Sequence, residues 1–330
     1  MLTSHRIMDM ALQEVALDHI EDSPGPCCMS FGFDLDLLIR SIKTVGLINP
    51  PVLKRNDPGN FTIVSGYRRI KALQSLNAGR IACRILPAHD VTPLQGLLLN
   101  LHDNLSTRKL NDVEKAMVLS RLAPWVPKKE IVTHYMPLLG LPCHEPSLLF
   151  FLEIEENHGN RVKTFVADGR LSLQAVKMLV EIDAISRAGL LRFISDIRFN
   201  INQQIQYIDY VIDLSYIEEK PILDIVEEEV LEKIRSDTHM NRPQKAKAIL
   251  KNLRTQRYPS VVNAENRFKK TLIDLDLPKG TQISAPPYFE GEYYRLEVLF
   301  REGEDLKTKL EDLFRKQALV RLKNPWGQTP

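Results

Sequence analysis

Residues 63–72 read Ile-Val-Ser-Gly-Tyr-Arg-Arg-Ile-Lys-Ala, which indicates the end of a β-strand, a glycine turn and a helix that opens with two arginines. This arrangement suits an anion, because a helix N-terminus carries unpaired N–H groups and the positive end of a dipole. Gly66 lets the backbone approach an anion closely. Arg68 and Arg69 add guanidinium groups that bind phosphate oxygens in pairs. The same stretch also fits an ordinary solvated helix face, so the flanking sequence is needed to distinguish that from an anion site.

The sequence around this turn predicts a small α+β domain over residues 34–92. Apolar residues recur at helical spacing between residues 35 and 45, and Gly46 follows where a C-cap glycine belongs. Strands are expected at residues 52–54, 61–64 and 81–86, with a turn at residues 57–60. Residues 1–33 are expected to form a poorly packed leader, because Ser23–Pro26 reads as a turn or linker.

The remaining sequence is expected to be mostly helical, so the predicted fold class is α+β. A helical domain is predicted over residues 93–237 and a basic segment over residues 238–258. A small α+β domain should complete the chain over residues 259–330. In that domain residues 293–300 alternate like a strand and residues 305–317 form an amphipathic helix.

Length and composition limit the number of domains, the location of the protein and the kinds of site that it can carry. A chain of 330 residues is expected to form two or three domains. Its net charge of +2 neither requires nor excludes nucleic acid. Because no apolar run is long enough for a membrane span and the first residues lack a signal-peptide core, we expect a cytoplasmic protein. The four cysteines show no metal-ligand spacing, so reduced thiols and no zinc site are expected.

Two further segments stand in a fixed order with the glycine-arginine turn. Residues 46–54 read G-L-I-N-P-P-V-L-K, residues 66–72 read G-Y-R-R-I-K-A, and residues 103–116 read D-N-L-S-T-R-K-L-N-D-V-E-K-A. Together they resemble the ParB family of DNA-partition proteins, whose members carry G-x-x-Q-P-x-x-V-R, G-E-R-R-x-R-A and E-N-x-Q-R-x-x-L-N-x-x-E-x-A. Residues 166–176, V-A-D-G-R-L-S-L-Q-A-V, resemble the segment that this family carries after its helix-turn-helix. The resemblance covers roughly residues 35–182.

The resemblance implies a DNA-binding CTPase that forms a clamp on DNA. In the family the G-E-R-R segment cradles the nucleotide triphosphate and the E-N segment holds Mg²⁺, an ion that prefers one or two carboxylates together with phosphate oxygens. Carried over, the Mg²⁺ ligands would be Asp103 and Asn104. The nucleotide, CTP or another nucleoside triphosphate, would be bound by Gly46, Asn49, Lys54, Ser65, Gly66, Tyr67, Arg68, Arg69, Asn104 and Arg108.

The sequence also departs from the family pattern at this site. Tyr67 replaces the family's glutamate, which leaves cytidine selectivity and hydrolysis open, and no catalytic residue is assigned. Asp103 is shorter than the family's glutamate, and Lys54 keeps the charge of an arginine without its bidentate fork. The family's Gln and Arg of the third motif become Ser106 and Thr107, and Arg108 stands one position along as a substitute.

The same fold class includes proteins with other functions. Sulfiredoxin carries a catalytic cysteine at the position of Tyr67, so a redox function is disfavoured, and no acidic cluster supports a nuclease. A ParB-like enzyme that acts on a small substrate, such as a nucleotide-dependent kinase, stays open because of Tyr67 and the acidic helix described next. A regulatory binding module without catalysis also stays open, with the C-terminal α+β domain mediating self-association.

DNA binding has two candidate surfaces. Family position puts a helix-turn-helix at residues 128–156, but its second helix offers Glu153, Glu155 and Glu156, which suit phosphates poorly. Residues 238–264 contain no Asp or Glu, and six phosphate contacts there would give a salt slope of about −5. A solvated basic linker is the alternative. The expected partners are DNA, a second copy of the chain and a partition ATPase, with association to the nucleoid. The DNA-binding residues predicted in this segment are Arg242, Lys245, Lys247, Lys251, Arg254 and Arg257.

Overall fold

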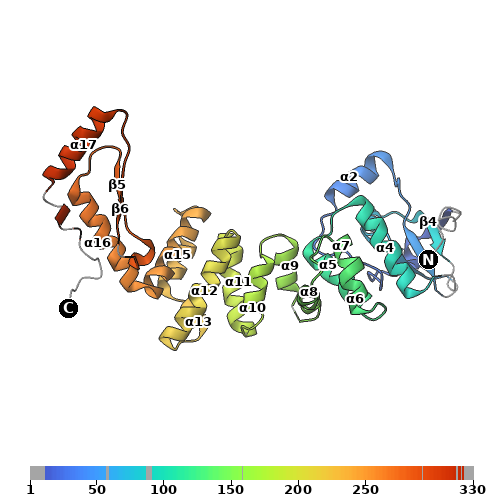
Figure 1. The fold of residues 1–330 in the computed structure, drawn as a ribbon. Coiled ribbons are helices and arrows are strands. Elements are labelled where there is room, and N and C mark those ends of the chain that lie inside the picture. The colour runs from blue at the N-terminus through green and yellow to red at the C-terminus, as the bar shows by residue number, and fades with distance from the viewer. Residues whose placement is uncertain are drawn as a thin grey trace. The chain divides into compact units, whose positions relative to one another are not determined.

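The computed structural model has the predicted α+β fold class (Figure 1). It describes residues 12–56, 59–86, 91–157, 159–291, 293–316, 319–320 and 322. The chain divides into two compact units, residues 1–181 and residues 182–330. Within the described residues, every helix is too short or too polar to span a bilayer.

A four-stranded sheet organises the first unit. Its strands are β1 (Leu12–Ala16), β2 (Val52–Arg55), β3 (Phe61–Ser65) and β4 (Arg80–Leu86), in the spatial order β1-β4-β2-β3. The pairings β1–β4 and β2–β3 are antiparallel, whereas β4 and β2 run parallel. Apolar side chains on one face form a core with the helix that follows β3, so the glycine turn is held at the end of a buried strand.

The N-terminal segment is part of this sheet. Residues 12–16 pair in register with β4, and Val15 and Leu17 are buried in the core. The segment at residues 27–29 is buried as well. The prediction of a poorly packed leader is therefore wrong for residues 12–20 and 27–29, and residues 1–11 lie outside the described residues. The turn predicted at residues 57–60 also lies partly outside them.

Two helices cover the sheet next to the turn. Helix α2 (Asp36–Val45) ends at Gly46, whose φ of 77° and N–H bond of 2.9 Å to the Ile42 carbonyl confirm the predicted C-cap. Helix α3 (Tyr67–Ser75) begins at the glycine turn and packs against α2. The loop from Gly46 to β2 thus returns to the N-terminus of α3.

Helices α4 (Pro93–Thr107) and α5 (Asp112–Leu122) follow the sheet. Both begin with a capping box, centred on Thr92 and Asn111, in which side chain and backbone exchange hydrogen bonds. Asn100 fixes α4 to the sheet through a 2.5 Å bond from its amide to the Val64 carbonyl. The C-terminal half of α4 therefore lies beside the end of β3.

The rest of the first unit is helical, as predicted. Helix α5 packs against both α8 and α9. The region predicted as a helix-turn-helix, residues 128–156, is helical over residues 128–138 and 145–157, and the first of these stretches has a π-helical centre. The elements are α6 (Lys128–Glu130), η2 (Ile131–Tyr135), α7 (Met136–Leu138), α8 (Glu145–Asn157), α9 (Asn160–Ala167) and α10 (Leu173–Leu179).

The second unit begins as stacked helices and ends in a small α+β part. Its basic segment is not a linker but helix α15 (Arg242–Arg257), whose apolar side packs on α12 (Ile201–Glu218) and α14 (Glu229–Ser236). A two-stranded antiparallel sheet and a last helix match the predicted strand and amphipathic helix, although residue 317 lies outside the described residues. The elements are α11 (Ala184–Ile197), α12 (Ile201–Glu218), α13 (Ile222–Val226), α14 (Glu229–Ser236), α15 (Arg242–Arg257), α16 (Pro259–Leu275), β5 (Thr281–Ser284), η3 (Pro287–Phe289), β6 (Arg295–Val298) and α17 (Gly303–Arg315).

Candidate nucleotide site

A cavity of about 310 Å³ lies between the loop after α2, the N-terminus of α3 and the C-terminal half of α4. Its volume is in the range of small-molecule sites. Three sequence motifs that lie far apart in the chain meet here. The predicted nucleotide residues in its wall are Gly46, Asn49, Ser65, Gly66, Tyr67, Arg68, Arg69, Asn104 and Arg108. Lys54 is the exception, because its ammonium group points to the Val91 carbonyl at 3.3 Å and it lies outside the lining.

Gly66 opens the helix that faces this cavity. Its φ of 96° lies in the left-handed region, and a Cβ there would come within 2.9 Å of the Pro51 Cβ. No side chain of the described residues caps the N-terminus of α3. The first-turn N–H groups of α3 are therefore available to an anion.

Arg69 crosses the wall of the cavity. Its Nη1 donates to the carbonyl oxygens of Asn49 at 2.9 Å and Pro50 at 3.3 Å, and its Nη2 donates to Asp103 Oδ2 at 3.0 Å. The same carboxylate oxygen accepts from the Ser65 hydroxyl. Asp103 thus neutralises Arg69 instead of lining the cavity, and it faces an adjoining, larger cavity of about 1020 Å³.

Arg68 leaves the same helix turn in another direction. Its Nη2 lies 2.5 Å from Glu114 Oε1, its Nε donates to the Ser30 hydroxyl at 3.3 Å, and its guanidinium stacks on the Phe33 ring at 4.8 Å. Burial and the neighbouring charge of Arg108 lower the pKa of Arg68, an effect that Glu114 partly opposes. Arg68 is therefore a partly desolvated cation with one carboxylate partner.

Arg108 ends α4 and reaches the same carboxylate. Its Nη1 donates to Glu114 Oε2 at 2.6 Å, its Nη2 to the Met29 carbonyl at 3.2 Å and its Nε to Asn104 Oδ1 at 2.7 Å. Asn104 in turn donates its amide to the Asn100 carbonyl at 2.9 Å. The structure thus brings Arg108 into the cavity wall, where the sequence suggested it as a substitute arginine.

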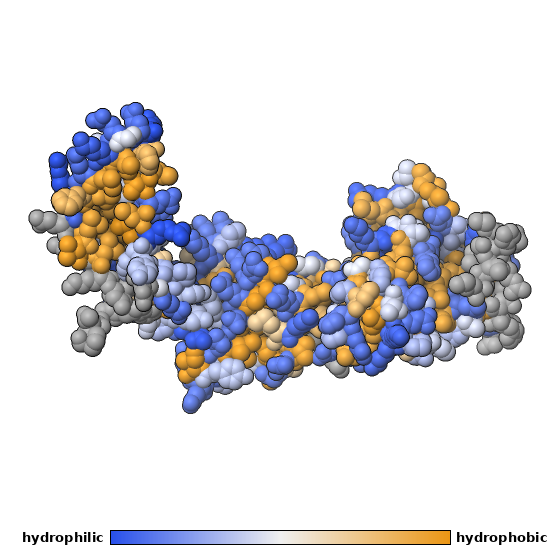
Figure 2. All heavy atoms as spheres, in the orientation of Figure 1, coloured by the Kyte–Doolittle hydropathy of each residue, from blue (hydrophilic) through white to orange (hydrophobic). Residues whose placement is uncertain are grey.

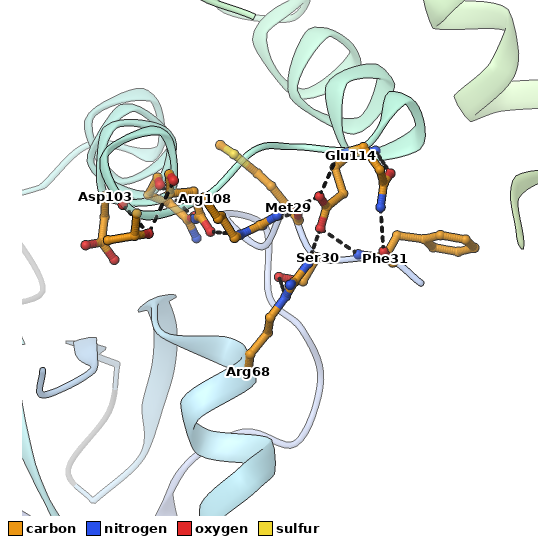
Figure 3. A network of polar contacts seen from close by, with 11 residues as sticks. Met29, Ser30, Phe31, Arg68, Asp103, Arg108 and Glu114 are labelled. Carbon is orange, nitrogen blue, oxygen red and sulfur yellow. Dashed lines mark hydrogen bonds and ion pairs between the residues drawn. The ribbon is translucent and has the colours of Figure 1, made fainter. Parts of the chain in front are cut away.

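Glu114 lies behind the cavity wall and is a residue that the sequence alone did not single out. Its side chain is only 1% exposed, and Figure 3 shows Arg68 and Arg108 converging on it. It also accepts the N–H groups of Phe31 at 3.2 Å and Asn111 at 3.0 Å. The capping-box spacing from Asn111 to Glu114 was a visible signal for the last of these bonds but not for the two arginines.

Tyr67 and Cys28 bear on the chemistry of the site. The ring of Tyr67 meets Phe33 edge-on at 6.0 Å and carries the ammonium of Lys71 at 5.6 Å from its centre. Burial raises the pKa of the Tyr67 phenol and of the Cys28 thiol, so both are protonated at neutral pH. Neither residue supplies the carboxylate that the family has at position 67.

The donor set fits an anion better than a bare metal ion. Among the described residues, no cluster of three or more His, Cys, Asp or Glu side chains is arranged to hold a metal. Asp103 is paired with Arg69, and the amide oxygen of Asn104 is occupied by Arg108. Because Mg²⁺ often uses only one or two carboxylates plus phosphate oxygens, these two residues fit it only together with a bound triphosphate.

The six basic residues predicted to bind DNA all lie on α15. Three of them instead contact other parts of the chain and so stabilise the fold. Arg254 makes a bidentate pair with Glu265 at 2.8 and 2.6 Å, and Arg257 pairs with Asp213 at 2.7 Å. Lys245 donates to the Arg235 carbonyl at 2.6 Å. Arg242, Lys247 and Lys251 are exposed, and none of them forms an ion pair with another described residue.

The other candidate DNA surface, helix α8, is largely a packing element. Leu148, Phe151 and Ile154 are buried, as expected for a helix that packs on α5. Glu155 is paired with Lys163 at 2.9 Å, so one of its acidic side chains is neutralised. The remaining exposed edge offers few groups that could read base edges.

Comparison with known proteins gives a match over the N-terminal part of the chain. The model of the family described as "ParB N-terminal domain" matches residues 3–100. "Probable chromosome-partitioning protein ParB" of Chlamydia pneumoniae is 33% identical over 114 residues, which cover 33% of this chain and 39% of that protein. The protein of the same name in Neisseria meningitidis serogroup A is 27% identical over 173 residues, covering 47% and 59%.

A third relative and two solved structures extend the comparison. The "Nucleoid occlusion protein" of Listeria monocytogenes is 26% identical over 184 residues, covering 52% of this chain and 62% of that protein. C-terminally truncated ParB from Caulobacter crescentus aligns with TM-scores of 0.33, in complex with the parS site, and 0.26, in complex with CTP-γ-S. These alignments have 14% and 18% identity and cover 58% and 53% of this chain and 96% of each of those chains. The chain spans about 39–62% of the length of the three relatives.

Proposed function

Because this chain carries a ParB N-terminal domain, we propose that it is a DNA-binding partition protein in which CTP and Mg²⁺ act as a conformational switch. The resemblance found in the motifs is confirmed over residues 3–100. The observation that carries the nucleotide proposal is the cavity beside α3. There Arg68, Arg69 and Arg108 surround a helix N-terminus that no described side chain caps.

Electrostatics supports a triphosphate in this cavity. Three guanidinium groups face two carboxylates, Asp103 and Glu114, so the wall keeps an excess of positive charge. Arg69 and Arg108 can also exchange a neutral carbonyl partner for a phosphate oxygen, and Arg68 can exchange the Ser30 hydroxyl, since charge-assisted bonds are about twice as strong as neutral ones. We propose that Asp103 and Asn104 hold Mg²⁺ against the phosphates once the ligand has drawn Arg69 away from Asp103 and the Arg108 Nε away from the Asn104 amide oxygen, while Arg108 Nη1 stays on Glu114. The metal would supply charge neutralisation there.

The test is a calorimetric titration of the full chain with CTP, ATP, GTP and UTP, each with Mg²⁺. The account predicts saturable binding of at least one of these nucleotides at micromolar to millimolar concentration. Selectivity for CTP would support the family's nucleotide, and equal binding of all four would assign the site to the triphosphate alone. Absence of binding for every nucleotide at millimolar concentration rejects the nucleotide switch.

A DNA partner is proposed from the partition proteins that the chain resembles and from α15. Arg242, Lys247 and Lys251 form an exposed basic set on this helix, and Lys247 and Lys251 lie one turn apart. The helix-turn-helix-like region around α8 is the second candidate surface. Association with the nucleoid, and with a partition ATPase as the family resemblance implies, belongs to the same proposal.

A homodimer is proposed through the C-terminal α+β part. Figure 2 shows apolar residues gathered in this part of the chain. Phe300 at 53%, Leu310 at 48% and Phe314 at 92% are exposed there, and Leu310 and Phe314 line one hollow on α17. Such exposure is uncommon unless a partner covers it, and a two-stranded sheet needs further packing for stability. Sedimentation equilibrium of the full chain against a Leu310→Gln/Phe314→Gln variant tests this. A monomeric parent chain contradicts it.

One observation favours a second candidate, a ParB-like enzyme acting on a small substrate in the manner of a kinase. The cavity of about 1020 Å³ adjoins the proposed phosphate site and shares Asn49, Arg69 and Thr107 with it. It also presents His102 and Tyr135. This candidate predicts nucleotide turnover without DNA that a small hydroxyl compound accelerates. Strong salt-dependent DNA binding without such turnover excludes it and leaves a switch or a non-catalytic binding module.

A further inference from the structure

Glu114 ties four separate segments of the first unit to one buried carboxylate. Its partners are Phe31 in the segment before α2, Arg68 on α3, Arg108 at the end of α4 and Asn111 at the N-cap of α5. Figure 3 shows Phe31, Arg68 and Arg108 approaching Glu114 from different elements. A carboxylate that is 1% exposed requires such partners, because an unpaired buried charge is costly.

Of these partners, Arg68 is the one with the clearest alternative to Glu114 as a binding partner. It is the second residue of α3, so it stands beside the uncapped N–H groups at which a phosphate would bind. Arg108 is held by two further acceptors, Asn104 Oδ1 and the Met29 carbonyl, whereas the other hydrogen bond of Arg68 is a 3.3 Å contact with a hydroxyl. Of the two arginines, Arg68 is therefore the guanidinium that a ligand can take from Glu114 with the smaller loss of hydrogen bonds.

We propose that Glu114 is a positioning residue that competes with the ligand for Arg68. In the ligand-free protein Arg68 binds Glu114 and links α3 to α5; with a triphosphate at α3, Arg68 turns to the phosphates and the link is released. This inference rests on the proposed function and names how the site is regulated. Glu114 keeps Arg108 and both backbone N–H groups in the exchange, so its charge stays compensated.

The release has a structural consequence within the same unit. Helix α5 packs against α8, the second helix of the candidate DNA-binding region. Breaking the Arg68–Glu114 pair removes a direct tie between α5 and the helix that would hold the phosphates. The Arg68–Glu114 pair is thus a contact with two states, formed or broken, through which a bound ligand can change the position of α5 and of the helix α8 that packs on it.

Replacing the Glu114 carboxylate should change the affinity for triphosphate in a direction that a purely structural role would not give. Glu114→Gln removes the competing charge yet keeps the capping box, which accepts either Glu or Gln at this position. We expect triphosphate binding to tighten about tenfold, the change that follows if the internal pair occupies Arg68 for about nine-tenths of the time. A residue that merely supported the fold would weaken binding when replaced.

Asp112→Asn is the matched control. It removes one negative charge from the same helix turn, where Asp112 pairs only with Lys115 among the described residues. Calorimetric titrations with CTP–Mg²⁺ and with inorganic triphosphate are compared for the parent chain and both variants. Binding to Glu114→Gln that is several-fold tighter than to Asp112→Asn supports the competition. Binding that equals the control or is weaker overturns it.

A second measurement keeps the proposal testable if Glu114→Gln does not fold, as judged by circular dichroism. Hydrogen exchange of the parent chain with and without triphosphate should show faster exchange in the first turn of α5 when ligand is bound. Unchanged exchange there, with ligand demonstrably bound, also overturns the proposal. If the parent chain binds neither CTP nor inorganic triphosphate, the proposed nucleotide site itself is wrong and this inference is rejected with it.

Discussion

Arg69 and Asp103 form an ion pair, with 3.0 Å between Nη2 and Oδ2, in the wall that separates the two adjoining cavities of the first unit. The predicted phosphate ligand and the predicted Mg²⁺ ligand therefore satisfy each other in the ligand-free protein. Their side chains are 21% and 36% exposed, so the pair is partly solvated and contributes only about 1 kcal/mol or less. A bound triphosphate with its metal could separate the two residues at modest cost.

Substituting Asp103→Asn is expected to separate the two roles of this carboxylate. Binding of CTP with Mg²⁺ should weaken, because one metal ligand loses its charge. Binding of CTP in EDTA should stay the same or tighten, because Arg69 is released to the phosphates. Isothermal titration calorimetry with and without Mg²⁺ measures both.

The control for this substitution is Asp36→Asn, which removes a charge from the first turn of α2, outside both cavities. If Asp103→Asn reduced affinity equally with and without Mg²⁺, the residue would not serve the metal, and the assignment of Asp103 as a metal ligand would have to be dropped.

Gly66→Ala is expected to destabilise the first unit. The new Cβ would lie 2.9 Å from the Pro51 Cβ at a φ of 96°, so backbone strain and a steric clash act together. We expect a loss of about 1–3 kcal/mol in the free energy of unfolding, measured by urea denaturation. Gly79→Ala is the matched control, since a Cβ at Gly79 meets nothing within 4 Å and its φ is not in the left-handed range. Equal midpoints for the two variants would contradict this role of Gly66.

Local patterns in the sequence were sufficient to predict the glycine turn and the helix that follows it. Strand β3, Gly66 and α3 are encoded within one short stretch, and Gly46 ends α2 as its position predicts. The three motifs in their order were also sufficient to predict a shared site, because nearly all of the predicted nucleotide residues line one cavity.

Contacts between distant residues could not be predicted in this way. The sequence predicts residues 12–16 as part of a leader, because the place of strand β1 depends on pairing with β4, which lies more than 60 residues away. The roles of Glu114 and Arg254 were missed for a similar reason. Their partners, Arg68 and Glu265, are fixed by how helices pack, and no periodicity of the sequence reports that.

The exposed basic set of α15 should govern the salt dependence of DNA binding. The triple substitution Arg242→Gln, Lys247→Gln and Lys251→Gln removes three phosphate-binding groups, so the slope of log K against log salt should become shallower by about 2–3. Fluorescence anisotropy over a series of salt concentrations measures this. Arg254→Gln serves as control, because Arg254 already pairs with Glu265. An unchanged slope in the triple variant would place DNA elsewhere on the chain.

The Arg254–Glu265 pair makes the second unit sensitive to acid. The hydrogen bond from Arg254 lowers the pKa of Glu265 below its ordinary value of 4.5. The pair therefore contributes stability that is fully present above pH 4.5 and is lost as the pH falls through the lower pKa of the folded state. Thermal melts between pH 7 and 3 should show this loss for the parent chain but less of it for Glu265→Gln. Glu290→Gln, at an exposed position, should behave like the parent chain, and identical pH profiles for all three proteins would contradict the assignment.

The central claim is that the α3 arginines bind a nucleoside triphosphate, and calorimetric titration of CTP–Mg²⁺ into an Arg68→Gln/Arg69→Gln variant tests it most directly. Arg40→Gln/Arg80→Gln is the matched control, with the same loss of charge at two exposed positions outside the cavity. The account predicts saturable binding to the parent chain and the control, and binding at least about tenfold weaker to the Arg68/Arg69 variant, since each charge-assisted bond contributes about 1.5–3 kcal/mol. Equal affinity in a folded Arg68/Arg69 variant would contradict the claim.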